Sequence, residues 1–142
     1  MAIVREVLEE KGHRVWTIAP DRFVYDAVAL MAEKEIGALM VVQDDKVVGL
    51  ISERDYARKV ILKGRASKDT HVRDIMETRV VYARPDQTVE ECMAIVTDRR
   101  VRHLPVLENA KLIGIISIGD LVKSIIAEQK FIIDQLVDYI KS

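Results

Sequence analysis

The sequence contains few of the residues that build disulfides, aromatic stacks or strong electric fields. Cys92 is the single cysteine among 142 residues, which excludes an internal disulfide and fits a reducing compartment. One Trp, four Tyr and two Phe are too few for the series of rings on which single-stranded nucleic acid stacks. A formal net charge of −1 gives no general attraction to nucleic acid or to anionic membranes. We therefore expect neither partner.

Long apolar runs are also absent. No segment approaches the ~18 consecutive apolar residues that a membrane-spanning helix needs. Glu6, Glu9 and Glu10 interrupt the start of the chain, where a secretory signal would be apolar. With 49% hydrophobic and 32% charged residues, the composition is that of a globular domain, and we expect a cytoplasmic protein.

The sequence lacks the usual signatures of catalysis. Neither a Gly-x-x-x-x-Gly-Lys-[Ser/Thr] loop nor a Gly-x-Gly-x-x-Gly motif is present. His13, His71 and His103 are scattered, and Cys92 has no partner at metal-ligand spacing, so no metal site is expected. Without a placed base, metal or nucleophile, we nominate no catalytic residue, no catalytic cofactor and no enzymatic activity.

The sequence does contain an internal repeat, with two prolines marking its period. Pro20 and Pro85 lie 65 residues apart (85 − 20). At this offset Lys46, Gly49, Ile51, Ser52 and Asp55 match Lys111, Gly114, Ile116, Ser117 and Asp120. A shorter lead-in at residues 4–8 resembles residues 72–76 at an offset of 68. We place domain boundaries at 1–64, 65–127 and 128–142, the last being a C-terminal extension.

Each half contains the pattern Gly-x-x-Ser-x-x-Asp, at residues 49–55 and 114–120. The pattern is typical of a strand that runs into a helix, with Ser at the N-cap and Asp in the first turn. In one interpretation the two residues form a capping box and satisfy each other's backbone donors. In the other, the helix dipole keeps the carboxylate ionised, and it accepts hydrogen bonds from a vicinal diol such as ribose. Two copies inside a larger repeat favour the second interpretation.

The apolar periodicity predicts the order β-α-β-β-α in each half. In the first half we expect a strand at 15–18 and then a helix that starts at the turn 19–21, has its apolar stripe at 24–31 and ends at Gly37. A hairpin of strands 38–42 and 47–51 follows, and then a helix from Ser52 to about 62. In the second half we expect a strand at 80–83, a helix through 89–96, a hairpin of strands 104–107 and 112–116, and a helix from Ser117. A further helix at 2–11, ended by Gly12, precedes the first half.

The strand at 38–42 is apolar without alternation, which is typical of a strand covered on both faces. We therefore predict an α+β fold in which the two β-α-β-β-α repeats pack sheet to sheet with pseudo-two-fold symmetry, plus N- and C-terminal helices. Cys92 is expected to be a small buried hydrophobe. The C-terminal segment has a wide apolar face, which either packs back onto the body or joins another subunit. Its residues are Ile132, Ile133, Leu136, Val137 and Ile140.

With both motifs placed, the chain resembles a tandem pair of cystathionine-β-synthase (CBS) domains, also called a Bateman module, from about residue 4 to 127. The two Ser-containing motifs, the two lead-ins and residues 102–106 (Arg-His-Leu-Pro-Val) support this resemblance. It is also similar to small bacterial proteins that consist of this module alone. The resemblance implies a regulatory sensor with two clefts between the repeats for AMP, ADP, ATP, NAD or S-adenosylmethionine. A ligand-free interaction or dimerisation scaffold is the alternative.

The resemblance also implies which residues bind the ligand. The Asp of each motif takes the ribose hydroxyls, with its Ser beside it: Ser52 and Asp55, Ser117 and Asp120. Arg102 and His103 meet the phosphates. The base lies between residues of the strands, which are Thr17, Ile18, Pro20, Ala38 and Leu39 in the first half and Tyr82, Ala83, Pro85, Leu104 and Pro105 in the second.

The two halves differ at this expected site. The first half has Gly37 and Ala38 where the second has Arg102 and His103, so Arg54 or Arg58 would have to supply its positive charge. We therefore expect the two sites to be inequivalent. The basic run at 99–103 is equally typical of a solvated helix end, where cations oppose the helix dipole. The single tryptophan, at position 16, is expected to pack in the core.

Unpaired apolar helix faces at both ends of the chain lead us to expect a homodimer, as the resemblance also implies. Because the module accounts for the whole sequence, the signal would pass to a downstream protein that the sequence does not identify.

Overall fold

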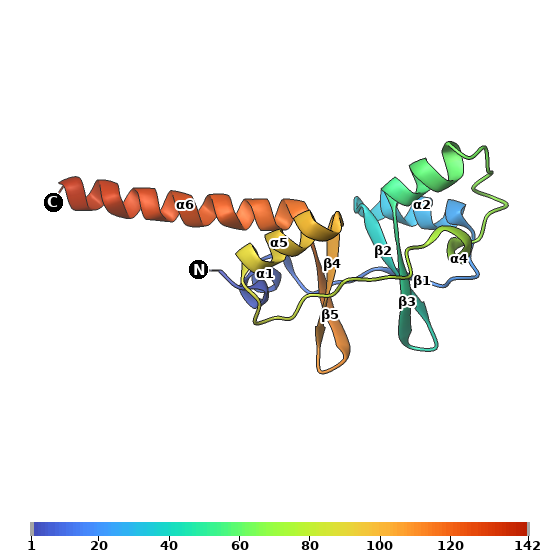
Figure 1. Cartoon of the computed structure of the whole chain (residues 1–142), viewed down its shortest axis with the longest axis horizontal. Coiled ribbons are helices and arrows are strands. Elements are labelled where there is room, and N and C mark those ends of the chain that lie inside the picture. Colours follow the sequence, from blue (N-terminus) through green and yellow to red (C-terminus); the bar gives the residue numbers. More distant parts are fainter. Residues whose placement is uncertain (1, 142) are drawn as a thin grey trace. The chain divides into compact units, whose positions relative to one another are not determined.

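The computed structural model describes residues 2–141, and the chain divides into two compact units (Figure 1). The first unit is Val15–Val80, and the second unit combines the residues up to Arg14 with those from Val81 onward. Each unit has one small sheet and its own helices, which confirms the α+β class.

The first unit is built on a three-stranded sheet. β1 (Thr17–Ile18) pairs in parallel with β2 (Ala38–Gln43), which pairs antiparallel with β3 (Lys46–Ser52). The β2–β3 turn consists of Asp44 and Asp45, with φ of 53° and 62°, because a two-residue turn that matches strand twist needs positive φ at both positions. The helices are α2 (Val24–Lys34), α3 (Glu53–Tyr56), its π-helical continuation η1 (Ala57–Ile61), and α4 (Val72–Ile75).

The second unit repeats the hairpin, with β4 (His103–Glu108) antiparallel to β5 (Lys111–Ser117). Asn109 and Ala110 form its turn, with φ of 52° and 64°. Each hairpin has a register shift at the same place, after Val41 and after Val106. The helices of this unit are α1 (Val4–Lys11), α5 (Val89–Arg99) and α6 (Ile118–Lys141).

The strand predicted at 80–83 is wrong in its extent, because only a single parallel bridge forms there, between Ala83 and Val106. In the first unit, Met40 N–H donates to the Trp16 carbonyl at 3.1 Å and extends the ladder of β1. The position that matches Met40 in the second unit is Pro105, which has no N–H to donate. The proline therefore shortens the edge strand of the second sheet.

The end predicted for the first long helix was also wrong. Helix α2 ends before Gly37, at Glu35, which adopts left-handed backbone with φ 54°. Arg100 ends α5 in the same way, with φ 56°. In both cases the next residue is apolar and its N–H donates back into the helix, Ile36 to the Met31 carbonyl and Val101 to the Val96 carbonyl. This hydrogen bond, with an apolar residue after the cap, is a helix end that does not require glycine.

Each short lead-in helix, α1 or α4, packs on the hairpin of the other half of the sequence. Helix α1 precedes the first half but lies in the second unit, where Val4 N–H donates to the Gln87 carbonyl and Arg5 N–H to the Pro85 carbonyl, both at 2.9 Å. Its Leu8 is fully buried and lies against Gly114 of β5, where a Cβ would come within 2.6 Å of Leu8 Cδ2.

Helix α4 makes the matching contacts in the first unit. Val72 N–H donates to the Arg22 carbonyl at 2.8 Å and Arg73 N–H to the Pro20 carbonyl at 3.0 Å. A Cβ on Gly49 of β3 would lie 2.7 Å from Sδ of Met76, which follows α4. The glycine that opens each motif is therefore needed for the close approach of a lead-in helix to the hairpin.

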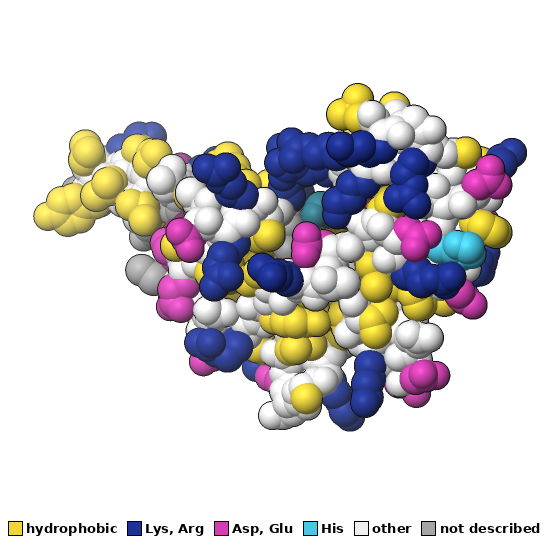
Figure 2. Space-filling view, turned by 45° about the vertical axis from the view of Figure 1, so that its right-hand side comes forward, with side chains coloured by type: hydrophobic (Ala, Val, Ile, Leu, Met, Phe, Trp, Pro, Cys, Tyr) yellow, Lys and Arg dark blue, Asp and Glu magenta, His cyan; other side chains and the backbone are white. Residues whose placement is uncertain are grey.

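Helix α6 extends well beyond the core of its unit (Figure 1). Leu121 is its only fully buried side chain among those that the structure describes. The interpretation in which the C-terminal apolar face packs back onto the body is wrong, because its side chains are 40–80% exposed. These side chains are Ile132, Ile133, Leu136, Val137 and Ile140. Figure 2 shows hydrophobic side chains gathered at the left, over the end of this helix.

Candidate functional site

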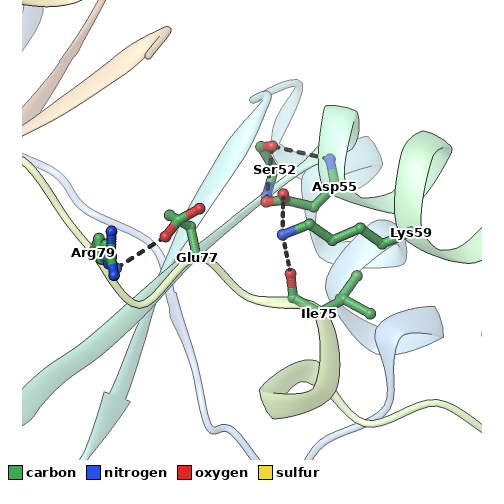
Figure 3. A network of polar contacts seen from close by, with 6 residues as sticks. All are labelled: Ser52, Asp55, Lys59, Ile75, Glu77 and Arg79. Atoms are coloured by element: carbon green, nitrogen blue, oxygen red, sulfur yellow. Dashed lines mark hydrogen bonds and ion pairs between the residues drawn. The ribbon is translucent and has the colours of Figure 1, made fainter. Parts of the chain in front are cut away.

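The first motif places a carboxylate at the start of α3 (Figure 3). Oδ2 of Asp55 accepts hydrogen bonds from Ser52 N–H at 2.9 Å and from the Ser52 hydroxyl at 3.0 Å, and Asp55 N–H donates to Ser52 Oγ at 3.2 Å. Lys59, one turn further along, lies 3.1 Å from Oδ1 of Asp55 and also donates to the Ile75 carbonyl at 2.9 Å. The Asp55 side chain is only 15% exposed.

The second motif has the same cap at the start of α6. Oδ2 of Asp120 accepts from Ser117 N–H at 2.8 Å, and Asp120 N–H donates to Ser117 Oγ at 3.2 Å. Here the lysine comes from the end of α1, because Lys11 Nζ donates to the same Oδ2 at 2.6 Å and to the Ile115 carbonyl at 2.8 Å. The capping-box interpretation therefore describes both motifs, and a lysine pairs with each carboxylate.

Burial by itself would raise the pKa of Asp120, but hydrogen bonds from Lys11 and Ser117, together with the positive charge of Lys11, outweigh burial and hold that pKa below its ordinary value. The Asp120 side chain is 22% exposed. It is thus an ionised carboxylate that solvent and a small ligand can reach.

The two carboxylates differ in the acceptor positions that they leave open. A carboxylate oxygen accepts about two hydrogen bonds. Both oxygens of Asp55 are engaged, Oδ2 by Ser52 and Oδ1 by Lys59. In Asp120 both contacts fall on Oδ2, and no residue in the described range 2–141 donates to Oδ1. Asp120 is therefore the better placed of the two to accept a ligand hydroxyl.

A backbone contact holds each helix start beside the strand that opens the hairpin. Glu53 N–H donates to the Gly37 carbonyl at 3.1 Å, and Ile118 N–H donates to the Arg102 carbonyl at 2.9 Å. In the sheets Ala38 pairs with Ser52, and His103 pairs with Ser117. The Gly–Arg difference noted in the sequence therefore falls next to the motif serine in both units.

The apolar residues proposed to surround a base lie mostly in the interiors of their units. Leu39 and Leu104 are 0% exposed and belong to the core of the first and second unit respectively. Thr17 is exposed, and burial raises the pKa of the half-buried Tyr82 hydroxyl. The remaining proposed base-contact residues are buried, namely Ile18, Pro20, Ala38, Ala83, Pro85 and Pro105.

The proposed cationic groups are accessible. Arg54 and Arg58 are exposed on α3 and η1, Arg102 is exposed, and His103 is half-buried. Arg99 lies in the last turn of α5. The basic run at 99–103 is therefore in part a helix end, as one of its two interpretations expected. Trp16 packs against the core of the first unit with Lys34 Nζ 4.3 Å from its ring centre, as the core-packing interpretation expected.

The sequence interpretation missed Lys11 and Lys59. Lys59 follows Asp55 by four residues on one helix, the spacing at which opposite charges meet, so this pair could have been found. Lys11 and Asp120 are 109 residues apart, and no sequence pattern joins them. Their contact depends on the packing of α1 against the second hairpin.

The rest of the described chain shows no competing centre. Cys92 is fully buried on α5, and burial, with a smaller effect of Glu91, raises the pKa of its thiol to about 11. Residues 2–141 contain no group of three or more His, Cys, Asp or Glu side chains arranged to hold a metal ion. None of the helices described has both the length and the apolar character to cross a membrane.

Comparison with known proteins identifies the two halves. The model of the CBS domain family matches twice, at residues 4–62 and 72–127. A mitochondrial CBS domain-containing protein of Arabidopsis thaliana, CBSX3, is 38% identical over 148 aligned residues, which cover 97% of this chain and 71% of the relative.

Solved structures agree. A protein with CBS domains from Burkholderia ambifaria MC40-6 is 53% identical, with a TM-score of 0.87 over 90% of this chain and 96% of its own. The CBS domain pair of protein MJ0100, solved with 5′-methylthioadenosine and S-adenosyl-L-methionine, has a TM-score of 0.80 over 90% of this chain and 98% of its own. Its identity of 19% shows a common fold alone.

Proposed function

The chain belongs to the CBS domain family, and from this premise we propose that it is a regulatory module that binds an adenosine ligand, namely AMP, ADP, ATP or NAD, through its two motif aspartates. The observation that supports the proposal most directly is Asp120, an ionised and accessible carboxylate with one oxygen open to a ligand hydroxyl. The CBS domain pair of MJ0100, which shares this fold, was solved with two compounds that contain adenosine.

The ribose diol is the part of the ligand that this carboxylate fits. Two adjacent hydroxyls can donate to one carboxylate group, whereas the adenine base offers no such pair. The exposed Arg102 beside Ser117 would then contact the phosphates. Because Asp55 has both oxygens engaged and no arginine at the position of Arg102, we expect Asp120 to serve the tighter site.

The test is calorimetry with adenosine, AMP, ATP and NAD on the wild type, Asp55→Ala and Asp120→Ala. A hydrogen bond to a charged group contributes roughly 1.5–3 kcal/mol, so Asp120→Ala is expected to weaken the tighter site about ten- to a hundredfold. Asp134 is exposed on α6, so Asp134→Ala is the matched control. If the wild type binds none of the four compounds, the scaffold function replaces this one. If it binds and neither motif substitution changes affinity, the aspartates are helix caps only.

We also propose that the module acts as a homodimer through α6. A helix end with several apolar side chains that are 40–80% exposed gains stability when a second copy covers them, at about 25 cal/mol per Å² of apolar surface buried. Ile133→Asp and Leu136→Asp should convert the dimer into a monomer, and Asp134→Ala should not. A wild-type mass equal to one chain at micromolar concentration, by light scattering with and without nucleotide, would reject the dimer.

In this proposal the protein binds the nucleotide without converting it, and a downstream protein responds to the bound state. The side chains that contact the two aspartates are Ser52 and Lys59 in the first unit and Ser117 and Lys11 in the second, and these groups cap the helix and pair with the carboxylate charge. Release of phosphate or adenine from a nucleotide, abolished by Asp120→Ala, would contradict it. The cytoplasmic location stays a prediction, and one relative is named as mitochondrial.

A further inference from the structure

A lysine connects the motif aspartate to the lead-in helix in both units, but from opposite directions. In the first unit Lys59 belongs to the helix that follows the motif, and its Nζ reaches the carbonyl of Ile75, the last residue of lead-in helix α4. In the second unit Lys11 is the last residue of lead-in helix α1, and its Nζ reaches Asp120. We call these contacts the Lys59 bridge and the Lys11 bridge.

The bridges do not derive from the repeat itself. At an offset of 65, the counterpart of Lys59 is Ser124, and at the lead-in offset of 68, the counterpart of Lys11 is Arg79. Arg79 lies beyond α4, where its N–H donates to the Glu77 carboxylate at 3.0 Å (Figure 3). Neither lysine has a lysine as its counterpart in the other half. Both lysines nevertheless connect a motif aspartate to the lead-in helix that packs beside it. Two unrelated positions thus make the same kind of connection with different hydrogen bonds, which indicates that the connection matters beyond the local packing of either helix.

The bridges occupy acceptor positions that a ribose diol needs. The two hydroxyls of a diol are best accepted by the two different oxygens of one carboxylate. On Asp120, Oδ2 already accepts from Ser117 N–H, a cap that the backbone fixes, and from Lys11. On Asp55, Lys59 occupies Oδ1. Asp120 can therefore accept the two hydroxyls on different oxygens only after Lys11 leaves. On Asp55, Oδ2 already accepts from Ser52 N–H and from the Ser52 hydroxyl, so Lys59 must leave and that hydroxyl must also rotate away.

We propose that a bound ribose diol displaces Lys11 from Asp120 and Lys59 from Asp55, and that ligand binding thereby loosens each lead-in helix. This inference rests on the proposed function. The lysines are able to leave, because their side chains are 35% and 42% exposed and an ammonium group in water is well solvated. The apolar contacts of the helices stay in place, so the change is confined to the ends of α1 and α4.

The residues after Lys11 show what would loosen. Gly12 N–H donates to the Leu8 carbonyl at 2.6 Å, and the His13 ring lies 2.9 Å from the Ile113 carbonyl. In the first unit the matching amide is Met76 N–H, which donates to the Val72 carbonyl at 3.0 Å. The amides of Gly12 and Met76 make the last hydrogen bonds of the two lead-in helices, so their exchange rates measure how stable the helix ends are.

The first experiment measures adenosine binding in an Asp55→Ala background, so that the Asp120 site is seen alone. Lys11→Met is expected to tighten adenosine about fivefold, since removing a half-exposed ion pair that competes with ligand is worth up to about 1 kcal/mol. Lys59→Met in an Asp120→Ala background should act likewise. The matched controls are Lys111→Met and Lys46→Met, at the far ends of the seven-residue strands β5 and β3 from the motif serines. Lys11→Gln serves as a second variant if Lys11→Met disturbs folding by circular dichroism.

The second experiment measures amide hydrogen exchange. Saturating adenosine should speed exchange at Gly12 and Met76 several-fold in the wild type, and Lys11→Met should speed exchange at Gly12 without ligand. Unchanged or weaker adenosine binding in both methionine variants, or slower exchange at these amides with ligand, would overturn the inference while the proposed function stands. If neither the wild type nor the methionine variants bind adenosine, both fail. If only the methionine variants bind it, the inference is supported.

Discussion

Adding one methyl group at Gly114 tests the exchange of lead-in helices between the halves. A Cβ at this position would lie 2.6 Å from Cδ2 and 3.1 Å from Cδ1 of Leu8, so Gly114→Ala forces a fully buried leucine out of its place. Overpacking of this kind costs typically ~1–3 kcal/mol. We expect about 2 kcal/mol of lost unfolding free energy, and a melting temperature lower by about 6 °C for a chain of this size.

The double substitution gives the sharper result. Leu8→Ala alone should cost ~2–5 kcal/mol because it removes a buried leucine. Once the leucine is gone, the methyl at position 114 meets no obstacle, so Gly114→Ala should then cost nothing or stabilise by up to ~1 kcal/mol through the unfolded chain. The expected coupling between the two positions is therefore about 2 kcal/mol in favour of the double variant.

Gly49 in the first unit provides a matched contrast. A Cβ there would lie 2.7 Å from Met76 Sδ but also 2.9 Å from the Glu77 carbonyl, and that carbonyl accepts Leu50 N–H at 2.9 Å. Because backbone cannot yield as a side chain does, Met76→Ala should rescue Gly49→Ala only in part.

Urea unfolding followed by circular dichroism measures all six variants. Fluorescence of Trp16, which lies in the first unit, reports on that unit separately. If the effects of Leu8→Ala and Gly114→Ala add within about 0.5 kcal/mol, α1 does not dock on the second hairpin and the reasoning is refuted.

Three further outcomes are expected. Cys92 should resist thiol reagents in the native chain and react after denaturation, because it is buried and its thiol pKa is about 11; rapid native labelling would contradict this. The pKa of Asp120 is held below 3.8 in the folded chain, so its ionised form stabilises the fold above that pH and the contribution is lost as pH falls through the lowered pKa. Asp120→Asn should therefore show a shallower loss of stability below about pH 4 in acid titrations, and a wild-type slope would argue against the ion pair. Arg102→Ala should weaken AMP more than adenosine in calorimetry, whereas an equal loss for both would place the guanidinium away from the phosphate.

The local part of this fold follows from the sequence because it depends on residues that are close along the chain. The serine caps, the two hairpins and the apolar stripe of α5 each depend on neighbours within a few positions. The motif glycines were recognised by spacing, but their reason was not, since Leu8 lies more than a hundred residues from Gly114.

The misplaced boundaries have equally specific causes. The short first strand of the second sheet reflects a missing N–H at Pro105, and the end of α2 at Glu35 reflects the apolar residue Ile36 that follows it. The positions of turn-forming residues such as Gly and Pro, from which the boundaries were predicted, reveal neither effect. The lysine on Asp120 could not be foreseen at all, because it depends on where α1 packs. The binding roles of the other nominated residues stay predictions.

The crossed packing of the lead-in helices has a consequence for how the chain can be divided. A fragment that ends at residue 64 would have the first hairpin without α4, and it would have α1 without the hairpin that α1 covers. Such a half could satisfy these contacts by exchanging lead-ins with a second copy, which is a domain swap. The intact chain is thus equivalent to a swapped pair joined into one polypeptide, and a circular permutant that begins near residue 66 would keep each helix–hairpin contact.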